Sequence, residues 1–359
     1  MTSETVARAV VPVRYARWDG VGRGFTVVPA TTPQTPGPGE VLARIDLATV
    51  CGSDLHSARG DRPSPVPGVL GHEQVGTVLA VGPDAPRCVD GSAVAAGARI
   101  VWSVAASCGR CDRCRRGLTQ KCRHLRKYGH EPLDDAEPLT GGFATHCIVL
   151  PGTAIVAVPD AVPDVVAAPA SCATATVAAV LGAAGDLDGA RVLVTGAGML
   201  GVTAVAMAAQ AGAHVIAADP GPARRERALR FGAAEVTADA TEHGPVDVAV
   251  ELSGAPAAVR TCLGALDVGG TAVLAGSVSP GEEVPLDPER LVRGLHSVVG
   301  VHNYRPADLR TAVDFLAAHH DRHPFAELVG GRFGLDALDD AFAAAHTGDA
   351  PRQGVVPSL

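Results

Sequence analysis

The stretch RVLVTGAGMLG, residues 191–201, decides the fold of the second half of the chain. Its first five residues form a short apolar run typical of a buried strand, and an alanine- and valine-rich helical segment follows. Between them stands G-x-G-x-x-G. In this motif the first glycine permits a tight turn, the second lets the backbone approach a pyrophosphate, and the third lets helix and strand pack closely. Phosphate charge would then face the free N–H groups of the helix. The residues expected to contact such a dinucleotide are Gly196, Gly198, Met199, Leu200 and Gly201.

The next strand, residues 214–219, ends in an acid, Asp219. An acid about 20 residues after the glycine turn can bond both ribose hydroxyls of NAD and repels the 2′-phosphate of NADP. Arg224 and Arg225 follow, and Arg224 is a further candidate for contact with the cofactor. Both arginines also fit the solvated face of a helix, so we expect NAD rather than NADP. The alternative is a purely structural turn with Asp219 facing solvent.

Strand-like and helical runs alternate through the rest of this half, which predicts a parallel, doubly wound sheet. The first ~160 residues instead carry short strands between proline and glycine turns, an irregular and mostly β pattern. The polar stretch 54–67 is expected to be a loop, and the tail from residue 304 mixes helix and strand. The further expected strands are residues 41–50, 73–81, 98–104, 142–158, 246–252, 271–276 and 297–301.

Four cysteines follow the pattern C-x2-C-x2-C-x7-C within a segment, residues 108–130, that has no apolar period. Four thiolates at this spacing can close a tetrahedral zinc site, and metal binding then orders a lobe that has no core of its own. An iron–sulfur cluster is the alternative ligand. The surrounding arginines and lysine offset the net negative charge of such a site, so they do not require nucleic acid. The four cysteines are Cys108, Cys111, Cys114 and Cys122.

A second set of metal ligands is scattered through the chain. Cys51 opens CGSDLH, His72 stands in GHE, and Cys172 stands in PASCATAT. Each alone is compatible with simple packing. Together they offer two thiolates and one imidazole, which leave a fourth position open, as a catalytic zinc requires. The remaining cysteines, at positions 88, 147 and 262, have no partners at ligand spacing.

Composition excludes several classes of protein. The 359 residues predict two domains, and 47% hydrophobic residues allow a substantial core. A net charge of −8 argues against general nucleic-acid binding. The apolar stretch 202–218 is interrupted by polar residues and falls short of the ~20 residues of a membrane span. The N-terminus lacks a secretory signal core, so we expect a cytoplasmic protein with reduced cysteines.

Taken in order, these motifs resemble the zinc-containing medium-chain alcohol dehydrogenase family over essentially the whole chain. The resemblance implies a GroES-like catalytic domain at residues 1–172 with a zinc lobe at 108–122, a Rossmann domain at 173–303, and a return to the catalytic domain at 304–359. It further implies a homodimer or homotetramer, paired through the edge of the cofactor sheet, for which residues 297–303 are the candidate.

The resemblance also assigns roles. It makes Cys51, His72 and Cys172 the ligands of a catalytic zinc, and the four-cysteine lobe the site of a structural zinc. Glu73 lies near the catalytic metal, and Asp54 orients the ring of His72. The metal polarises the substrate oxygen, and hydride passes between the substrate and the nicotinamide. The family's proton relay falls on Ser53 and His56. The alternatives are a turn-stabilising serine and an exposed loop histidine.

The substrate is less well defined. Arg59 and Arg62, in the loop SARGDRPSPVPG, can bind an anionic group, although Asp61 between them weakens this and surface arginines are usually only solvated. The strings GDRPSP, RKYGHE and PASCATAT resemble a subgroup associated with phosphonate metabolism, which implies a hydroxyalkylphosphonate and its aldehyde or ketone.

Two alternatives remain open. One is a polyol or cyclitol dehydrogenase, in which polar side chains meet ring hydroxyls. The other is a non-catalytic zinc-binding protein on the same fold, against which the complete ligand set argues. Near the C-terminus, Arg352 is a candidate for contact with the cofactor pyrophosphate. The polar candidates for the polyol reading are Lys127, Tyr128, His130 and Asn303.

Overall fold

The computed structural model describes residues 9–134, 137–239 and 244–358, which form two compact units. Unit 1 comprises Met1–Ser171 and Val329–Leu359, and unit 2 comprises Cys172–Leu328. The first boundary falls within one residue of the predicted one. The second differs: residues 304–328 belong to unit 2 rather than to the catalytic domain, because the buried face of helix α9 (Pro306–His319) packs on helix α4 (Ala173–Ala184).

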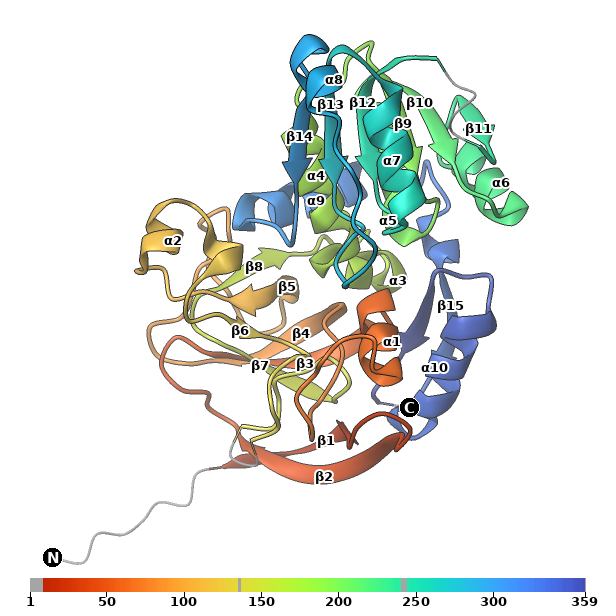
Figure 1. The fold of residues 1–359 in the computed structure, drawn as a ribbon. Coiled ribbons are helices and arrows are strands. Elements are labelled where there is room, and N and C mark those ends of the chain that lie inside the picture. The colour runs from red at the N-terminus through yellow and green to blue at the C-terminus, as the bar shows by residue number, and fades with distance from the viewer. Residues whose placement is uncertain (1–8, 135–136, 240–243, 359) are drawn as a thin grey trace, which may run out of the picture. The chain divides into compact units, whose positions relative to one another are not determined.

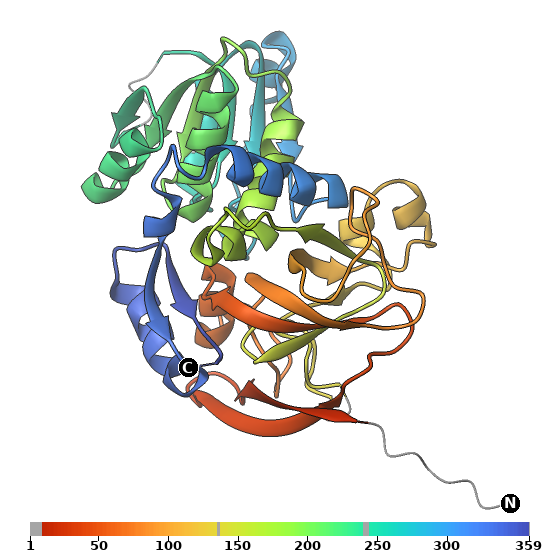
Figure 2. The ribbon, with the colours of Figure 1, turned by 180° about the vertical axis from the view of Figure 1, so that it is seen from behind.

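Unit 1 is built on β-structure, as predicted (Figures 1 and 2). In its described residues a two-stranded antiparallel sheet joins β1 and β2, and an eight-stranded sheet follows the order β15-β16-β3-β4-β5-β6, with β7 on β3 and β8 on β5. The strands are β1 Val10–Trp18, β2 Phe25–Pro33, β3 Val41–Thr49, β4 Gln74–Val81, β5 Arg99–Ala106, β6 Arg126–Lys127, β7 His146–Val149, β8 Thr153–Ala157, β15 Val329–Phe333 and β16 Arg352–Val355.

The last strand of the chain lies within this sheet, between β15 and β3. Strand β16 pairs antiparallel with β3 through Gly354 opposite Thr49, so the C-terminal residues lie beside the segment that leads to Cys51. The core of the unit includes Trp102 and Phe143, both fully buried. The helices of the unit are α1 Gly52–Arg59, α2 Asp112–Arg115, α3 Asp164–Ala167 and α10 Leu338–Thr347, with 3-10 turns at Thr119–Lys121, Ala168–Ser171 and Leu335–Ala337.

Helix α1 corrects the prediction of a loop at residues 54–67. The sequence there has no apolar period, and the helix depends on its ends instead. The Asp54 carboxylate accepts the backbone N–H of the N-cap Cys51 at 2.9 Å, and Gly60 ends the helix with φ +81°. A left-handed C-terminal glycine is a common helix stop. Only the part of the predicted loop after Gly60 is irregular.

Unit 2 is a parallel sheet with strand order β11-β10-β9-β12-β13-β14, so its strands run 3-2-1-4-5-6 in their order along the unit. This is the doubly wound arrangement, in which the order reverses between β9 and β12. The strands are β9 Arg191–Thr195, β10 His214–Ala218, β11 Glu235–Thr237, β12 Val246–Glu251, β13 Leu266–Leu274 and β14 Ser297–Gly300.

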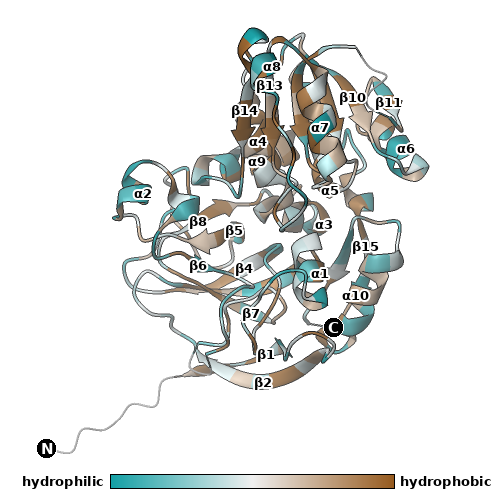
Figure 3. Ribbon diagram, in the orientation of Figure 1, coloured by the Kyte–Doolittle hydropathy of each residue, from teal (hydrophilic) through white to brown (hydrophobic). Residues whose placement is uncertain are grey.

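Helices cover both faces of this sheet. Helix α7 (Pro256–Ala265) contacts β9, β12 and β13 and lies in front in Figure 1, whereas α4 and α9 lie in front when the unit is seen from behind in Figure 2. Because both faces are covered, the residues of the central strands are mostly apolar and buried, and these strands are largely brown in Figure 3. The remaining helical elements of unit 2 are α5 Met199–Gln210, α6 Pro222–Arg230, α8 Pro288–Arg293 and a 3-10 turn at Phe325–Leu328.

Within the described residues, no single helix is long and apolar enough to cross a membrane. The bent pair Asp164–Ser171 and Ala173–Ala184 meets the criterion only when the two segments are taken together.

Candidate active site and cysteine centre

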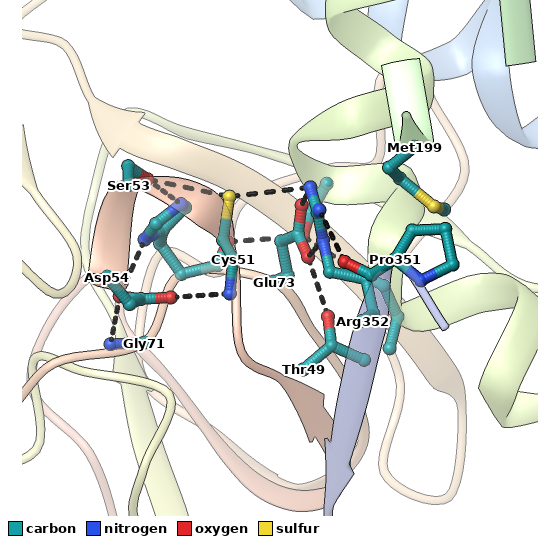
Figure 4. Close-up of polar contacts among 12 residues, drawn as sticks. Thr49, Cys51, Ser53, Asp54, Gly71, Glu73, Met199, Pro351 and Arg352 are labelled. Atoms are coloured by element: carbon teal, nitrogen blue, oxygen red, sulfur yellow. Dashed lines mark hydrogen bonds and ion pairs between the residues drawn. The ribbon is translucent and has the colours of Figure 1, made fainter. Parts of the chain in front are cut away.

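Asp54 ties the start of α1 to the segment that carries His72. One carboxylate oxygen accepts the N–H of Cys51 at 2.9 Å, and the other accepts the N–H of Gly71 at 3.2 Å (Figure 4). The side chain is almost fully buried, with 1% exposed. Two backbone donors therefore fix this carboxylate between the first two candidate metal ligands.

His72 lies among Cys51, Ser53 and Asp54. Its Nε2 is 3.0 Å from the hydroxyl of Ser53, which lies 3.5 Å from the Cys51 sulfur, and its Nδ1 is 3.5 Å from a carboxylate oxygen of Asp54. Burial disfavours a charged ring, but the Asp54 carboxylate and Cys51 outweigh it and raise the pKa of His72 to about 10. The Asp54 contact is thus electrostatic and holds the Nδ1 side of the ring, as a carboxylate behind a metal-bound histidine does.

Cys172 completes the cluster through its chain neighbour. The hydroxyl of Ser171 accepts the N–H of Gln74 at 3.3 Å and lies 3.3 Å from the carbonyl of His72, and the peptide bond to Ser171 then sets the position of Cys172. The ligand atoms of Cys51, His72 and Cys172 all lie within 4.8 Å of one another. Tetrahedral zinc with ligand bonds of 2.0 to 2.3 Å separates its ligand atoms by about 3.5 to 3.8 Å. Two thiolates and an imidazole at this spacing fit that ion.

Glu73 is fully buried beside the cluster and is paired with an arginine from the last strand. The Arg352 guanidinium donates to both carboxylate oxygens, at 2.6 and 2.9 Å, and the Thr49 hydroxyl donates to one of them at 2.6 Å. Arg352 also lies 3.4 Å from the Cys51 sulfur (Figure 4). Burial raises the pKa of Glu73, and Arg352 partly offsets this effect. Sequence reasoning missed both Thr49 and the 352–73 pair, and contact of Arg352 with a pyrophosphate stays a prediction.

The two loop arginines differ in their surroundings. Arg59 forms an ion pair with Asp61 at 2.9 Å, and the Asp61 carboxylate also contacts His56 Nδ1 at 3.0 Å. The hydrogen bond from His56 lowers the pKa of Asp61 and the charge of Arg59 adds to this effect, whereas burial opposes it. Arg62 is half-buried and has no hydrogen bond or ion pair with the described residues.

Tyr128 does not fit its expected role as a contact for substrate hydroxyls. It is 1% exposed, its hydroxyl lies 2.8 Å from the Thr153 hydroxyl, and it accepts the N–H of Leu150 at 2.7 Å. Its hydrogen-bonding capacity is used within the fold. The side chain therefore supports the β-sheet rather than a ligand.

The four cysteines of the lobe converge, with all sulfurs within 4.8 Å of one another. None of the nine cysteines forms a disulfide. Backbone N–H groups lower the pKa of the Cys111 thiol to about 6, whereas burial raises that of Cys114 to about 12. The lobe around α2 is hydrophilic (Figure 3), so four convergent sulfurs are the main element that can hold it. The donor set fits a closed zinc site.

The glycine turn of unit 2 has the geometry that its motif requires. A Cβ on Gly201 would lie 1.7 Å from the carbonyl oxygen of Gly196, and Gly196 itself has φ +89°. Gly198 is the N-cap of α5, and Met199 and Leu200 form its first turn. Asp219 holds this turn through both of its carboxylate oxygens. One oxygen accepts the N–H of Ala197 and the other accepts that of Gly221, each at 2.8 Å.

Asp219 is buried, with 3% exposed, and its carboxylate holds the glycine turn against the end of β10. Arg224 lies 3.7 Å from the same carboxylate, with 60% of its side chain exposed. The alternative of a solvent-facing Asp219 does not hold in the structure. Its bonding of a ribose stays a prediction.

Comparison with known proteins agrees with this geometry. Residues 37–160 match the model of the alcohol dehydrogenase GroES-like domain, and residues 200–318 match that of the zinc-binding dehydrogenases. The L-threonine 3-dehydrogenase of Anaeromyxobacter dehalogenans (strain 2CP-C) is 32% identical over 333 residues, which cover 87% of this chain and 89% of the relative.

Solved structures share the fold over the full length. An alcohol dehydrogenase from Thermotoga maritima superposes with a TM-score of 0.89 at 24% identity, covering 96% of this chain and 99% of that chain. A zinc-binding dehydrogenase from Sinorhizobium meliloti 1021, solved with NADP bound, gives 0.84 at 27% identity, covering 97% and 100%. The chain belongs to the zinc-containing medium-chain alcohol dehydrogenase family.

Proposed function

We propose that the protein transfers hydride between NAD(H) and a small alcohol, a hydroxyalkylphosphonate being the leading candidate, and its aldehyde or ketone. The observation that carries this proposal is the buried cluster of Cys51, His72 and Cys172 with the Ser53 hydroxyl beside it. A zinc ion held by these three residues would polarise the substrate oxygen, and a second zinc on the four lobe cysteines would order the lobe. The nicotinamide would supply or accept the hydride.

The chain's own residues handle the proton. The Ser53 hydroxyl lies next to the ligand cluster and can accept the substrate's proton while passing its own onward. His56, near the end of the same helix, has its Nδ1 held by Asp61 at 3.0 Å and is half-exposed, so it can pass a proton to solvent. Because Asp61 contacts Nδ1, the other ring nitrogen of His56, Nε2, faces away from this carboxylate. We therefore assign the relay to Ser53 and His56.

Cofactor choice follows from Asp219. A buried carboxylate at the end of the second strand disfavours a 2′-phosphate by charge repulsion, which supports NAD. The Sinorhizobium meliloti relative was solved with NADP, and the exposed Arg224 is the candidate contact for such a phosphate. The ratio of kcat/KM for NAD and NADP measures the preference, and an NADP preference in the wild type would contradict the assignment.

Polyol or cyclitol dehydrogenation is the second candidate. Relatives named L-threonine 3-dehydrogenase point to a small polar alcohol without a phosphonate group, which supports keeping this candidate. His130 and Lys127 stay candidate contacts for such a substrate, whereas Tyr128 is used within the fold. A neutral ring substrate would not need an anion-binding loop.

The experiment is turnover followed at the reduced-nicotinamide absorbance band with zinc-loaded protein. The panel pairs hydroxyalkylphosphonates with polyols, cyclitols and plain short alcohols, each with NAD and NADP. Turnover of phosphonates that Arg62→Ala reduces supports the leading candidate. Turnover confined to neutral polyols promotes the second. An absence of turnover with every alcohol, in protein with two zinc ions per chain, contradicts both.

We also propose a homodimer or homotetramer that pairs through β14. This strand is the edge of the described sheet in unit 2, and its Val298 is 41% exposed, next to Leu295 at 71%. An exposed apolar edge strand is a template for pairing. Light scattering of the wild type and of Val298→Lys tests it: the variant should shift towards monomer, and a monomeric wild type would overturn the proposal.

A further inference from the structure

A loop of unit 1 is held tightly along the segment that leads to His72. Gly68 bridges Pro132, and the N–H of Leu133 donates to the carbonyl of Pro67 at 2.8 Å. Gly129 packs so closely that a Cβ there would lie 2.5 Å from the carbonyl oxygen of Gly71. These backbone contacts fix the position of the residue between them, His130.

The imidazole of His130 lies against that of His72. The ring centroids are 5.2 Å apart and the planes are tilted by 32°. The Nε2 atom of His130 is buried and has no hydrogen-bond partner among the described residues. Buried polar atoms are nearly always paired, so an orphaned ring nitrogen beside a candidate metal ligand indicates a partner that the chain itself does not supply.

Positive charge gathers beside this ring. Arg62 stands in the loop that leads to Gly68, whose bridge partner Pro132 follows His130 by two residues. Burial contributes most to lowering the pKa of His130, and the charges of His72, Lys127 and Arg62 lower it further. The acid in the same loop, Glu131, is engaged by Arg126 at 2.7 Å and by the N–H of Lys127 at 2.8 Å.

Arg62 is a cation whose side chain can bind a ligand. It is half-buried and unpaired within the described part of the chain, in contrast to Arg59, which Asp61 neutralises. The loop that carries Arg62 is fixed to α1 by a hydrogen bond of 2.7 Å from Ser64 to Ser57. Because the loop is already fixed, less conformational entropy is lost when Arg62 binds a ligand than would be lost from a mobile loop.

We propose that Arg62 and His130 together bind an anionic oxygen group of the substrate, a phosphonate, phosphate or carboxylate, attached by a short chain to the reacting carbon. The guanidinium offers paired N–H donors that match such oxygens, and His130 Nε2 supplies one further hydrogen bond. The linker between the anionic group and the reacting carbon of the substrate must be short, because the His130 ring lies against that of His72, a candidate metal ligand. This inference rests on the proposed function and narrows its substrate to alcohols that carry an anion.

The test compares matched substrates and matched variants. The substrates are 2-hydroxyethylphosphonate, 3-hydroxypropionate and the neutral 1,3-propanediol. Arg62→Ala and His130→Gln should each lower kcat/KM for the anionic alcohols by about 10- to 100-fold more than they lower it for propanediol, the usual effect of losing a charge-assisted hydrogen bond. Arg62→Lys should fall between, because it keeps the charge and loses the fork. The relative rates with phosphonate and carboxylate identify the anion.

Two controls of the same residue types accompany them. Arg23 and His346 are exposed and unpaired within the described residues, so Arg23→Ala and His346→Gln should leave both substrate classes unchanged. His130→Gln keeps a polar side chain of similar size, and circular dichroism with thermal melting verifies that each variant is folded. Equal losses on anionic and neutral alcohols would overturn the proposal.

A binding measurement separates this inference from the proposed function. Methylphosphonate has no alcohol to oxidise, and calorimetry should show it binding the zinc-loaded wild type and losing about 10-fold or more in affinity with Arg62→Ala. Such binding without turnover of any alcohol would leave the anion site standing and refute the dehydrogenase proposal. Turnover of neutral alcohols with no preference for anionic ones, and no methylphosphonate binding, would refute the anion site alone.

Discussion

Replacing Arg352 by methionine tests the pair that joins the last strand to the candidate metal site. The substitution keeps the length of the side chain and removes both hydrogen bonds to Glu73, at 2.6 and 2.9 Å, together with the contact of 3.4 Å to the Cys51 sulfur. Arg352 is 5% exposed and Glu73 is fully buried. The variant therefore leaves a carboxyl group in the interior with only the Thr49 hydroxyl as a side-chain donor.

The expected cost follows from that burial. Breaking a buried ion pair by removing one partner costs about 3–5 kcal/mol, because the remaining charge is uncompensated. In a domain of about 150–250 residues each kcal/mol lowers Tm by about 2–4 °C, so unit 1 should melt about 6–20 °C lower. The double variant Glu73→Gln with Arg352→Met should recover a large part of this loss, since it leaves no buried charge.

Tryptophan fluorescence gives a reading specific to unit 1. The chain has two tryptophans, Trp18 and Trp102, and both are buried in that unit. Urea unfolding of the zinc-loaded wild type, the two single variants and the double variant forms a double-mutant cycle. A coupling energy below about 0.5 kcal/mol, the level typical of independent sites, would refute the reasoning. Arg23→Ala, at an exposed position, is the control and should not move the transition.

Three further predictions address the cysteine centre, the glycine turn and the relay. Because burial raises the pKa of Cys114, its thiol holds its proton at neutral pH, so zinc uptake by the lobe should release protons and tighten as pH rises. Proton release on zinc addition in weak buffer measures this, and pH-independent affinity would contradict it. Gly201→Ala should abolish NAD binding and unfold unit 2 more easily, because its Cβ would lie 1.7 Å from a carbonyl oxygen, whereas Gly198→Ala meets nothing within 4 Å and should still fold; calorimetry and melting compare them. Ser53→Ala should lower kcat by about 10²-fold or more with zinc content unchanged, and an unaltered kcat would remove Ser53 from the relay.

Features whose residues are close in sequence were predictable. The cysteines of the lobe lie within fifteen positions, so their spacing alone implied convergence, which the structure shows. The glycine turn joins a strand to the helix that follows it, and its requirement for glycine is a local backbone property. The parallel sheet followed from alternating runs of strand and helix, because each run carries its own periodicity. Helix α1 was missed since its stability lies in its caps rather than in an apolar period.

Contacts between distant segments had no signal in a single sequence. Only the pairing of β16 with β3 places Arg352 on Glu73, and only the packing of residues 129–133 along 67–71 sets His130 against His72. Likewise, the sequence alone made Arg59 and Arg62 equal candidates for binding an anion. In the structure, the turn after α1 places Arg59 in an ion pair with Asp61.

The sequence by itself determined the fold class, the family and the ligand types, because local spacing and periodicity encode them. The tertiary structure alone decided which charges are neutralised and which polar atoms are left without partners. Those outcomes depend on burial and on distances of a few ångströms between segments brought together by folding.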